Sequence, residues 1–381
     1  MINIGIAGCR RGASFATSLN EAGFKLHALM DPKPDAMDGM GDAQGVSHSH
    51  RFTEFGDLLV SGVEAVIVAS PMPFHAPQAV SALDLGVHVL SEVTAATSIN
   101  QCVELRQAAR RSDANYMMAE NCCYFKEVQM VAAMVSAGIF GDVYYAEGQY
   151  LHAVPELIFP KDGSVSWREK WQMGRRGLTY PTHSLGPVIT WLGGRVVSLS
   201  SRGTGARTWP QVGGDNTAVM LCQTESGALA SIRQDFQSHR PAGHYYQLQG
   251  TRGCYESPKG FGDTHKISLV DAPDGGENSW RPLSDFEGEF LPRLWKESEN
   301  ETSHAGHGGA DFLVLNEFAK TVRGETESPV DVYTAIDWTM TALISELSSE
   351  QGGEPISVPN SRNDELDIAA ANERESGRDD S

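Results

Sequence analysis

A glycine-containing turn that could hold a nucleotide lies at residues 8–13, where the sequence is GCRRGA between a strand-like run and a helix-like stretch. Glycines in such a turn let the backbone approach a pyrophosphate at a helix N-terminus. Gly8 fits the first glycine position, but Arg10 stands where the second is expected. Gly12 would then compensate through a rearranged turn, with Arg10 or Arg11 offering positive charge to the phosphates.

An acidic residue downstream distinguishes two dinucleotides. Asp31 ends the second strand-like run, 23 residues after Gly8, near the roughly 20-residue spacing at which a carboxylate binds the ribose 2′-hydroxyl of NAD. A carboxylate would repel a 2′-phosphate, so the pattern favours NAD over NADP. The competing interpretation makes Asp31 a turn residue before Pro32.

A second turn, Ser70 to His75, follows another strand-like run. Ligands of open α/β sheets lie beyond the carboxyl ends of the strands, so this turn should lie beside the cofactor. We interpret His75 as a residue that lines the cofactor site, although it could equally be a polar residue in the first turn of a helix.

The elements that must position these residues follow a regular order in the first 124 residues. Short β-branched runs alternate with amphipathic stretches of helix length, which indicates β-α-β units around a parallel sheet. The strands are predicted at 2–7, 25–30, 65–69, 88–91 and 116–118, and the helices include 14–22, 75–85 and 99–110.

A different pattern begins near residue 125. Strand-like runs at 143–150, 196–200, 217–223, 228–234 and 245–249 predict an open antiparallel sheet, and 311–323 and 331–349 read as helices. The sequence thus predicts an α/β protein with a Rossmann domain at 1–124 and an α+β domain at 125–360. Residues 361–381 carry seven acids and three arginines and are predicted to be a mobile tail.

Composition excludes several classes of function. The formal charge is −19, which opposes binding to nucleic acid or to an anionic membrane surface. No apolar run is long enough to cross a bilayer, and the N-terminus lacks the features of a signal peptide, so we expect a cytoplasmic protein. The six cysteines show no C-x-x-C spacing and suit buried thiols.

Several segments resemble the Gfo/Idh/MocA oxidoreductases over about residues 1–358. They are IGIAG, VIVASPMPFHAPQAVSAL, GVHVLSEV and MMAENCCY, followed by the change to a β domain. In that family a Rossmann domain holds NAD(P), and an open sheet covers the nicotinamide and forms the sugar site. Sugar dehydrogenases of the family usually carry Glu-Lys-Pro where this chain has Glu92-Val93-Thr94, so the lysine that helps to remove the hydroxyl proton is replaced.

The remaining motifs resemble glycoside hydrolase family 109 and its relatives, which are NAD-dependent glycosidases. These motifs are SEV followed by small residues, AENCCY, YLH, WRE and LTYPTHSLGP. The resemblance implies that the cofactor is lined by Asp31, Glu92, Val93 and Asn121, and that the sugar is faced by Tyr150, Arg168, Tyr180 and His183. A further substrate aromatic is assigned to Tyr245, with Tyr246 as the other candidate, and the fragment at 306–311 resembles the family's glycine-rich turn near the active site.

Such glycosidases do not rely on the usual pair of carboxylates. The resemblance implies oxidation at C3 of the sugar, loss of the C2 proton, departure of the aglycone, addition of water and return of the hydride. Tyr180 and His183 are three residues apart, so one helical turn could place both on one face. Histidine, with an ordinary pKa near 6.5, suits proton exchange with the C3 hydroxyl. We therefore expect His183 to be the main catalytic residue and Tyr180 the second.

Purely structural interpretations of the same residues compete with these roles. The LTYPTHSLGP motif could be only a helix N-terminus capped by Thr182. The basic stretch at 167–176 is either a solvated loop or a site for an anionic group on the sugar. We predict no metal, because neither the His48/His50 pair nor the His304/His307 pair adjoins a cysteine or carboxylate in a familiar ligand spacing.

Three hypotheses follow for the function. The leading one is an NAD-dependent glycoside hydrolase acting on an anionic or N-acetylated sugar. The alternatives are an NAD-dependent sugar or polyol dehydrogenase that uses His183 in place of the lysine, and a non-catalytic sensor of NAD or sugar. We also expect a homo-oligomer formed through the C-terminal sheet, since large apolar faces are rarely left in water.

Overall fold

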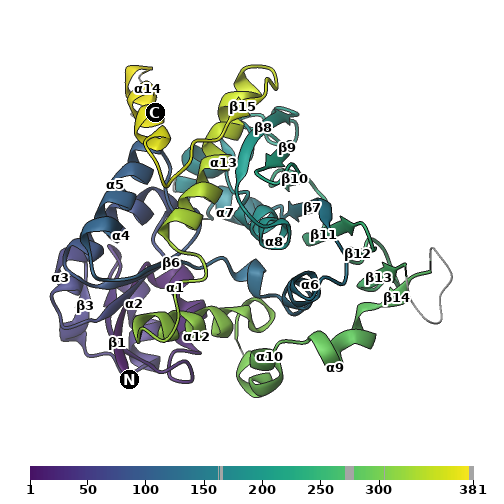
Figure 1. The fold of residues 1–381 in the computed structure, drawn as a ribbon. Helices are drawn as coiled ribbons and strands as arrows, with labels where there is room; N and C mark the ends of the chain where they lie inside the picture. Colours follow the sequence, from purple (N-terminus) through teal and green to yellow (C-terminus); the bar gives the residue numbers. More distant parts are fainter. Residues whose placement is uncertain (162, 164–165, 271–278, 304, 377–381) are drawn as a thin grey trace. The chain divides into compact units, whose positions relative to one another are not determined.

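The computed structural model describes residues 1–161, 163, 166–270, 279–303 and 305–376 (Figure 1). The chain divides into two compact units. The first, here called the Rossmann unit, comprises Met1–Asn121, Ser298–Thr339 and Asn360–Ser381, and the second, the sheet unit, comprises Cys122–Glu297 and Met340–Pro359. Each unit is thus assembled from separate stretches of chain, whereas the sequence predicted continuous domains divided after residue 124.

The Rossmann unit is built on a six-stranded parallel sheet in the order β3-β2-β1-β4-β5-β6. This is the strand order of a dinucleotide-binding fold, with the switch point between β1 and β4. The strands are β1 (Ile2–Ala7), β2 (Phe24–Met30), β3 (Arg51–Phe52), β4 (Ala65–Val68), β5 (His88–Ser91) and β6 (Tyr116–Met118).

Helices of this unit form two groups of mutual contacts, as expected for a sheet covered on both faces (Figure 1). One group contains α1 (Cys9–Ala16), α2 (Asp35–Ala43) and α12 (Ala310–Val322). The other contains α3 (Phe55–Leu59), α4 (His75–Asp84), α5 (Ile99–Arg111) and α14 (Glu365–Glu375). A short helix, α11 (Glu299–Thr302), contacts α12.

The predicted strands of this unit agree with the structure to within one residue at each end. All four residues of β4 are buried, which explains why such strands are continuous apolar runs in the sequence. The first helix differs: it covers Cys9–Ala16 and not 14–22. The helix begins directly after Gly8 because that residue alone makes the turn from β1.

The C-terminal segment is a second difference, because residues 365–375 form helix α14 and not a mobile tail. Leu366 is fully buried. Arg106 of α5, itself 1% exposed, donates to the carbonyl oxygens of Ser361 (3.2 Å) and Asn363 (2.8 Å) and pairs with Asp367 at 2.6 Å. These partners lie more than 250 residues away along the chain, so local composition could not reveal them.

The sheet unit contains nine strands in the order β14-β13-β12-β11-β7-β10-β9-β8-β15. The pairs are antiparallel except for β7 and β10, which are parallel, so the sheet is mixed and mostly antiparallel. The strands are β7 (Val143–Leu151), β8 (Val196–Gly203), β9 (Thr217–Thr224), β10 (Leu229–Asp235), β11 (Gly243–Gly250), β12 (Gly253–Glu256), β13 (Lys266–Leu269), β14 (Arg281–Pro282) and β15 (Ile356–Ser357).

Helix α8 (Thr182–Leu192) covers the centre of this sheet and contacts β7, β10 and β11. A Cβ atom on Gly148 of β7 would lie 2.0 Å from the carbonyl oxygen of Ser184, so a glycine is needed for α8 to approach so closely. Burial alternates along β9, as in a sheet with one packed face. The other helices are α6 (Lys126–Ser136), α7 (Pro155–Ile158), α9 (Glu287–Phe290), α10 (Arg293–Glu297) and α13 (Val332–Glu350), the last of which continues from one unit into the other.

Within the described part of the chain, no helix combines the length and the apolar character needed to span a membrane.

Candidate active site

The glycine turn lies between β1 and the N-terminus of α1, at the carboxyl end of the central strand. Gly8 has φ 89°, and a Cβ atom there would lie 2.3 Å from the carbonyl oxygen of Ala69. A Cβ on Gly12 would lie 2.3 Å from Cγ2 of Ile6. Gly8 therefore makes the turn and Gly12 lets the helix pack on the strand, so Gly12 does not substitute for the missing second glycine.

We expect Gly8→Ala to destabilise the fold more than a matched glycine substitution does. Gly86 also has a positive φ, 73°, but a Cβ there meets nothing within 4 Å. Gly86→Ala should therefore cost only the left-handed backbone penalty, about 1–2 kcal/mol. Gly8→Ala must in addition displace the Ala69 carbonyl, so its free energy of unfolding in urea should fall further. Equal losses in the two variants would contradict the steric role given to Gly8.

Asp31 is held against this turn. Its Oδ2 accepts the backbone N–H of Cys9 at 3.0 Å, and its Oδ1 accepts that of Lys33 at 3.0 Å. The structure thus brings together Gly8 and the carboxylate predicted to bind the ribose. This arrangement fits a dinucleotide, with the pyrophosphate at the turn and the ribose at Asp31. Gly8 has no room for a side chain, the N-terminus of α1 follows it, and the Asp31 carboxylate lies beside the turn.

His75 and Ser70 lie in the turn after β4. The buried His75 ring has Nδ1 2.7 Å from the Thr94 carbonyl oxygen and Nε2 2.8 Å from that of Ser70. The imidazole therefore ties this turn to the segment after β5. Val93, also buried, occupies the place of the dehydrogenase lysine, so residue 93 offers no ammonium group for proton transfer.

A polar network in the same unit joins Arg11 to residues distant in the sequence. Arg11 pairs with Glu92 at 2.6 Å and lies 3.9 Å from Asp311. Asp311 also accepts from Asn121 (3.3 Å) and contacts Nδ1 of His307 (3.0 Å). Arg11 is therefore engaged by carboxylates, while Arg10 is exposed.

The carboxylate of Asp311 should affect stability at acid pH. Burial raises its pKa, but hydrogen bonds and charge from His307, with smaller contributions from Arg11 and Asn121, outweigh this, and the net pKa lies below the usual 3.8. A carboxyl group whose pKa is lower in the folded than in the unfolded state stabilises the protein at pH values above its unfolded-state pKa. This stabilisation is lost as the pH falls through the folded-state pKa. We expect Asp311→Asn to flatten the decline in unfolding free energy below pH 3.8. This expectation is contradicted if the unfolding free energy of Asp311→Asn falls with decreasing pH as steeply as that of an Asp113→Asn control.

The residues predicted to face the sugar meet in the sheet unit. Tyr150, near the end of β7, has its ring centroid 4.9 Å from that of His183 and 6.3 Å from that of Tyr180. The rings of Tyr180 and His183 are 5.0 Å apart. His183 stands in the first turn of α8 and is 8% exposed, while Tyr180 is partly exposed. These three side chains are here called the ring cluster.

Sequence reasoning missed three further members of this neighbourhood. His244 stacks on Tyr150 at 4.9 Å, and Phe236 lies 5.5 Å from the same ring. His152 places Nδ1 2.5 Å from the Tyr150 hydroxyl. His244 is paired with Tyr150 across β11 and β7. The alternation of side chains along these two strands was therefore the sequence feature that could have identified His244.

Strand register separates the two remaining tyrosine candidates. Tyr245 pairs with Gln149, so its side chain lies on the face opposite to Tyr150, where its ring meets Arg240 at 5.3 Å. The structure therefore does not bring Tyr245 to the ring cluster. Tyr246 lies on the same face as Tyr150, and its hydroxyl donates to the carbonyl oxygen of His183 at 2.6 Å.

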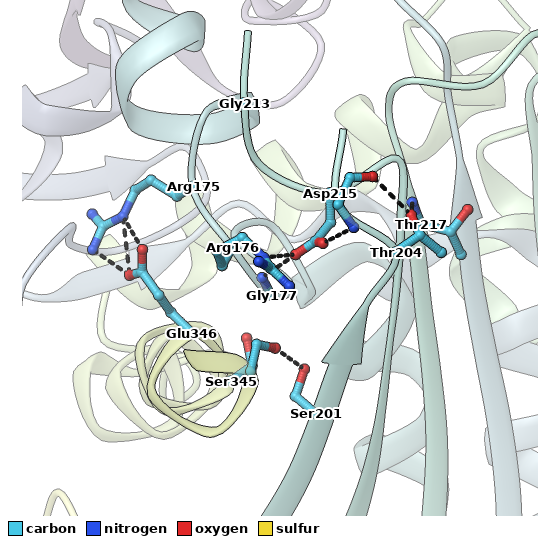
Figure 2. A network of polar contacts seen from close by, with 12 residues as sticks. Arg175, Arg176, Gly177, Ser201, Thr204, Gly213, Asp215, Thr217, Ser345 and Glu346 are labelled. Carbon is cyan, nitrogen blue, oxygen red and sulfur yellow. Dashed lines mark hydrogen bonds and ion pairs between the residues drawn. The ribbon is translucent and has the colours of Figure 1, made fainter. Parts of the chain in front are cut away.

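The basic stretch at 167–176 is largely engaged within the protein. Arg175 pairs with Glu346, and Arg176 pairs with Asp215 at 3.0 Å, as Figure 2 shows. Arg168 donates to Gln172 and lies over the Trp167 ring at 4.4 Å. Both Arg175 and Arg176 therefore already have a carboxylate partner within the protein.

The histidines considered for a metal have partners elsewhere in the protein where the structure describes them. The His50 ring packs against His27 at 4.6 Å. His307 contacts Asp311, while His304 lies outside the described residues.

Comparison with known proteins finds a matching family model for each half of the chain. The glycosyl hydrolase 109 C-terminal domain model matches residues 124–365, and the model of the oxidoreductase family with an NAD-binding Rossmann fold matches residues 2–120. A glycosyl hydrolase family 109 protein of Saccharopolyspora erythraea is 30% identical over 390 residues, covering 94% of this chain and 83% of the relative. An alpha-N-acetylgalactosaminidase of Tannerella forsythia is 28% identical over 338 residues, covering 78% and 70%.

Solved structures share the fold at low sequence identity. An NAD binding oxidoreductase from Klebsiella pneumoniae has a TM-score of 0.76 at 18% identity, with 94% of this chain and 98% of that chain covered. Levoglucosan dehydrogenase, solved with NADH and L-sorbose, has a TM-score of 0.77 at 16% identity, with 95% and 100% covered. These structures show the shared fold, and the match of residues 2–120 to the NAD-binding family model, together with the glycine turn and Asp31, confirms NAD as the cofactor. The chain belongs to glycosyl hydrolase family 109 and is an NAD-dependent glycosidase built on an oxidoreductase fold.

Proposed function

We propose that the protein hydrolyses a glycoside by transient oxidation of the sugar at C3, with the ring cluster supplying the acid and base groups. The observation that carries this proposal is the close approach of Tyr150, Tyr180 and His183, whose ring centroids lie 4.9 to 6.3 Å apart. A carboxylate pair, the usual requirement of glycosidases, is replaced in this scheme by an imidazole and a phenol.

When bound, NAD takes up a hydride from C3 of the sugar and returns it at the end of the cycle. His183 accepts the proton of the C3 hydroxyl during oxidation and gives it back in the last step. Tyr180 removes the C2 proton, which the C3 ketone has made acidic, and the aglycone leaves C1 as the C1–C2 double bond forms. Water then adds at C1, where it leaves its hydroxyl group, and its other proton goes to the oxygen of the departed aglycone, while Tyr180 returns a proton to C2. Because the hydride returns to C3, no net oxidation occurs.

The substrate class that we propose is an uncharged, N-acetylated sugar. Arg175 and Arg176 already face Glu346 and Asp215, so an added sugar carboxylate or sulfonate would have to compete with bound carboxylates. The relative from Tannerella forsythia is named for an N-acetylated sugar, which agrees with this choice. The anionic alternative would depend on Arg168 or Lys170.

The test is to incubate the protein with NAD+ and 4-nitrophenyl α-N-acetylgalactosaminide, with the matching uronide as the charged comparison. Nitrophenol release over many turnovers, without accumulation of NADH, is expected for the N-acetylated substrate. In D2O the product sugar should gain deuterium at C2. Stoichiometric NADH with free sugar would favour a dehydrogenase, and binding without turnover would favour a sensor.

We also propose that a second copy of the chain covers the outer face of the sheet. Val219, Leu221 and Leu229 are 42%, 49% and 39% exposed on β9 and β10, and large side chains of this kind are seldom left in water as a group. Light scattering on the purified protein tests this. The cytoplasmic location stays a prediction from sequence.

A further inference from the structure

The segment that leads to Tyr180 is held in place by side chains from other elements. Gly177 donates its backbone N–H to Asp215 (2.9 Å), Leu178 to Oγ of Ser345 (2.9 Å), and Tyr180 to Oε1 of Gln234 (2.7 Å). These contacts come from the loop before β9, from α13 and from β10. The segment at 175–180 thus has a fixed path without belonging to a helix or strand.

Asp215 binds two consecutive residues of this segment, Arg176 and Gly177 (Figure 2). Its Oδ2 accepts from Nε of Arg176 (3.0 Å) and from the N–H of Gly177 (2.9 Å), and its Oδ1 accepts from the N–H of Gly205 (2.6 Å). The side chain is 1% exposed. A Cβ on Gly203 would lie 2.0 Å from the carboxyl carbon, so the surrounding backbone leaves room for this carboxylate and little else.

The opposite side of the segment is blocked as well. A Cβ on Gly177, which has φ 74°, would lie 2.8 Å from Ser345. Arg175 pairs with Glu346, the next residue of α13. The segment is therefore fixed between α13 and the loop that carries Asp215, and Tyr180 is three residues beyond the Asp215 contact.

We propose that Asp215 is a positioning residue for Tyr180, an inference that rests on the proposed function of that tyrosine. The buried carboxylate fixes Arg176 and Gly177, and this fixes the backbone from which the Tyr180 ring extends. Asp215 does not touch the sugar. Its effect on the reaction arises because proton transfer from C2 depends on the position of the phenol.

The informative variant is Asp215→Asn. In either orientation of the amide, its NH2 group faces at least one of the three N–H donors, so the segment must shift although the side-chain volume is kept. A displacement of this kind typically costs about 10²-fold in turnover. We expect kcat on the nitrophenyl substrate to fall by about that factor, with NAD affinity unchanged.

A double-mutant cycle with Tyr180→Phe separates positioning from general destabilisation. If Asp215 acts through the Tyr180 hydroxyl, Asp215→Asn should cost less than about threefold in the Tyr180→Phe background, because coupled residues are not additive. Equal losses in both backgrounds would overturn the proposal. Asp263→Asn is the matched control, since Asp263 also accepts from two backbone N–H groups and a cation, and it should leave kcat unchanged.

Hydrogen exchange provides a readout that does not require activity. Asp215→Asn should raise the exchange rate of the 175–180 backbone amides, while Asp263→Asn should not. Absence of wild-type turnover would count against the proposed function, and unchanged exchange in Asp215→Asn would overturn the positioning role. Should Asp215→Asn fail to fold, Arg176→Ala removes one contact and keeps the other two, and is expected to lower kcat by about 3- to 10-fold if the segment shifts.

Discussion

Replacing His183 with alanine is expected to reduce glycoside turnover by about 10²- to 10⁴-fold, the range that a general acid–base residue contributes. The imidazole is 8% exposed and lies 4.9 Å from the Tyr150 ring and 5.0 Å from the Tyr180 ring, measured between centroids. In the proposed mechanism, His183 is the proton acceptor for the C3 hydroxyl. Its loss should stop the first step of the cycle.

The measurement combines turnover with cofactor binding. NAD affinity, followed by equilibrium titration, should stay within about twofold of the wild type, because His183 belongs to the sheet unit and the glycine turn and Asp31 belong to the Rossmann unit. His239→Ala, which removes an exposed histidine of the same unit, is the control and should keep its activity. Turnover that survives His183→Ala would remove this residue from the mechanism. A large loss of NAD binding would show that His183 contributes to the cofactor site and that its assignment to the sugar site is wrong.

The sequence predicted the Rossmann sheet closely for a physical reason. Strands β1, β4, β5 and β6 are mostly buried, so they appear as apolar runs bounded by turns, whereas the two-residue edge strand β3 is only partly buried and was not predicted. The start of α1 was predicted five residues late because its first turns are formed by residues 9–13, which the sequence pattern assigned to the glycine turn. The turn at Gly8 is determined by the nearby Ala69 carbonyl, which periodicity does not report.

The sugar half of the site was predicted from motifs, and the limits of that approach are visible in the tyrosines. Tyr150, Tyr180 and His183 are brought together, partly because Gly148 lets α8 lie close to β7. Tyr245 is not, because a one-residue change along a strand reverses the face of the side chain. His244 could have been identified only with the register of β11 against β7 in hand.

Contacts distant in sequence account for the other differences. Residues 361–375 pack on the Rossmann unit because Arg106 and the N-terminus of α5 bind them: Glu373 accepts the N–H groups of Ile99 (3.1 Å) and Asn100 (3.0 Å). The basic stretch at 167–176 looked like a candidate anion site, yet Arg175 is 171 residues from its partner Glu346. Neither pairing could be predicted from local composition.

Replacing Asp31 with alanine should weaken NAD binding by about 10- to 100-fold, since hydrogen bonds to a charged group contribute about 1.5–3 kcal/mol. Equilibrium titration with NAD and with NADP gives both affinities. Asp35→Ala removes an exposed carboxylate at the start of α2 and should change neither value. Unchanged NAD affinity in Asp31→Ala would contradict the nucleotide site.

The ratio of the two affinities identifies the cause of any loss. Asp31 also accepts the N–H groups of Cys9 and Lys33, so its removal could loosen the glycine turn and weaken both dinucleotides equally. If the carboxylate reads the ribose 2′-hydroxyl and repels a 2′-phosphate, NADP should lose less affinity than NAD or gain some. Asp31→Asn keeps one acceptor and removes the charge, and it should therefore shift the ratio toward NADP with a smaller loss of NAD binding. A parallel decline for both dinucleotides in both variants would leave Asp31 a role in building the turn and none in choosing the cofactor.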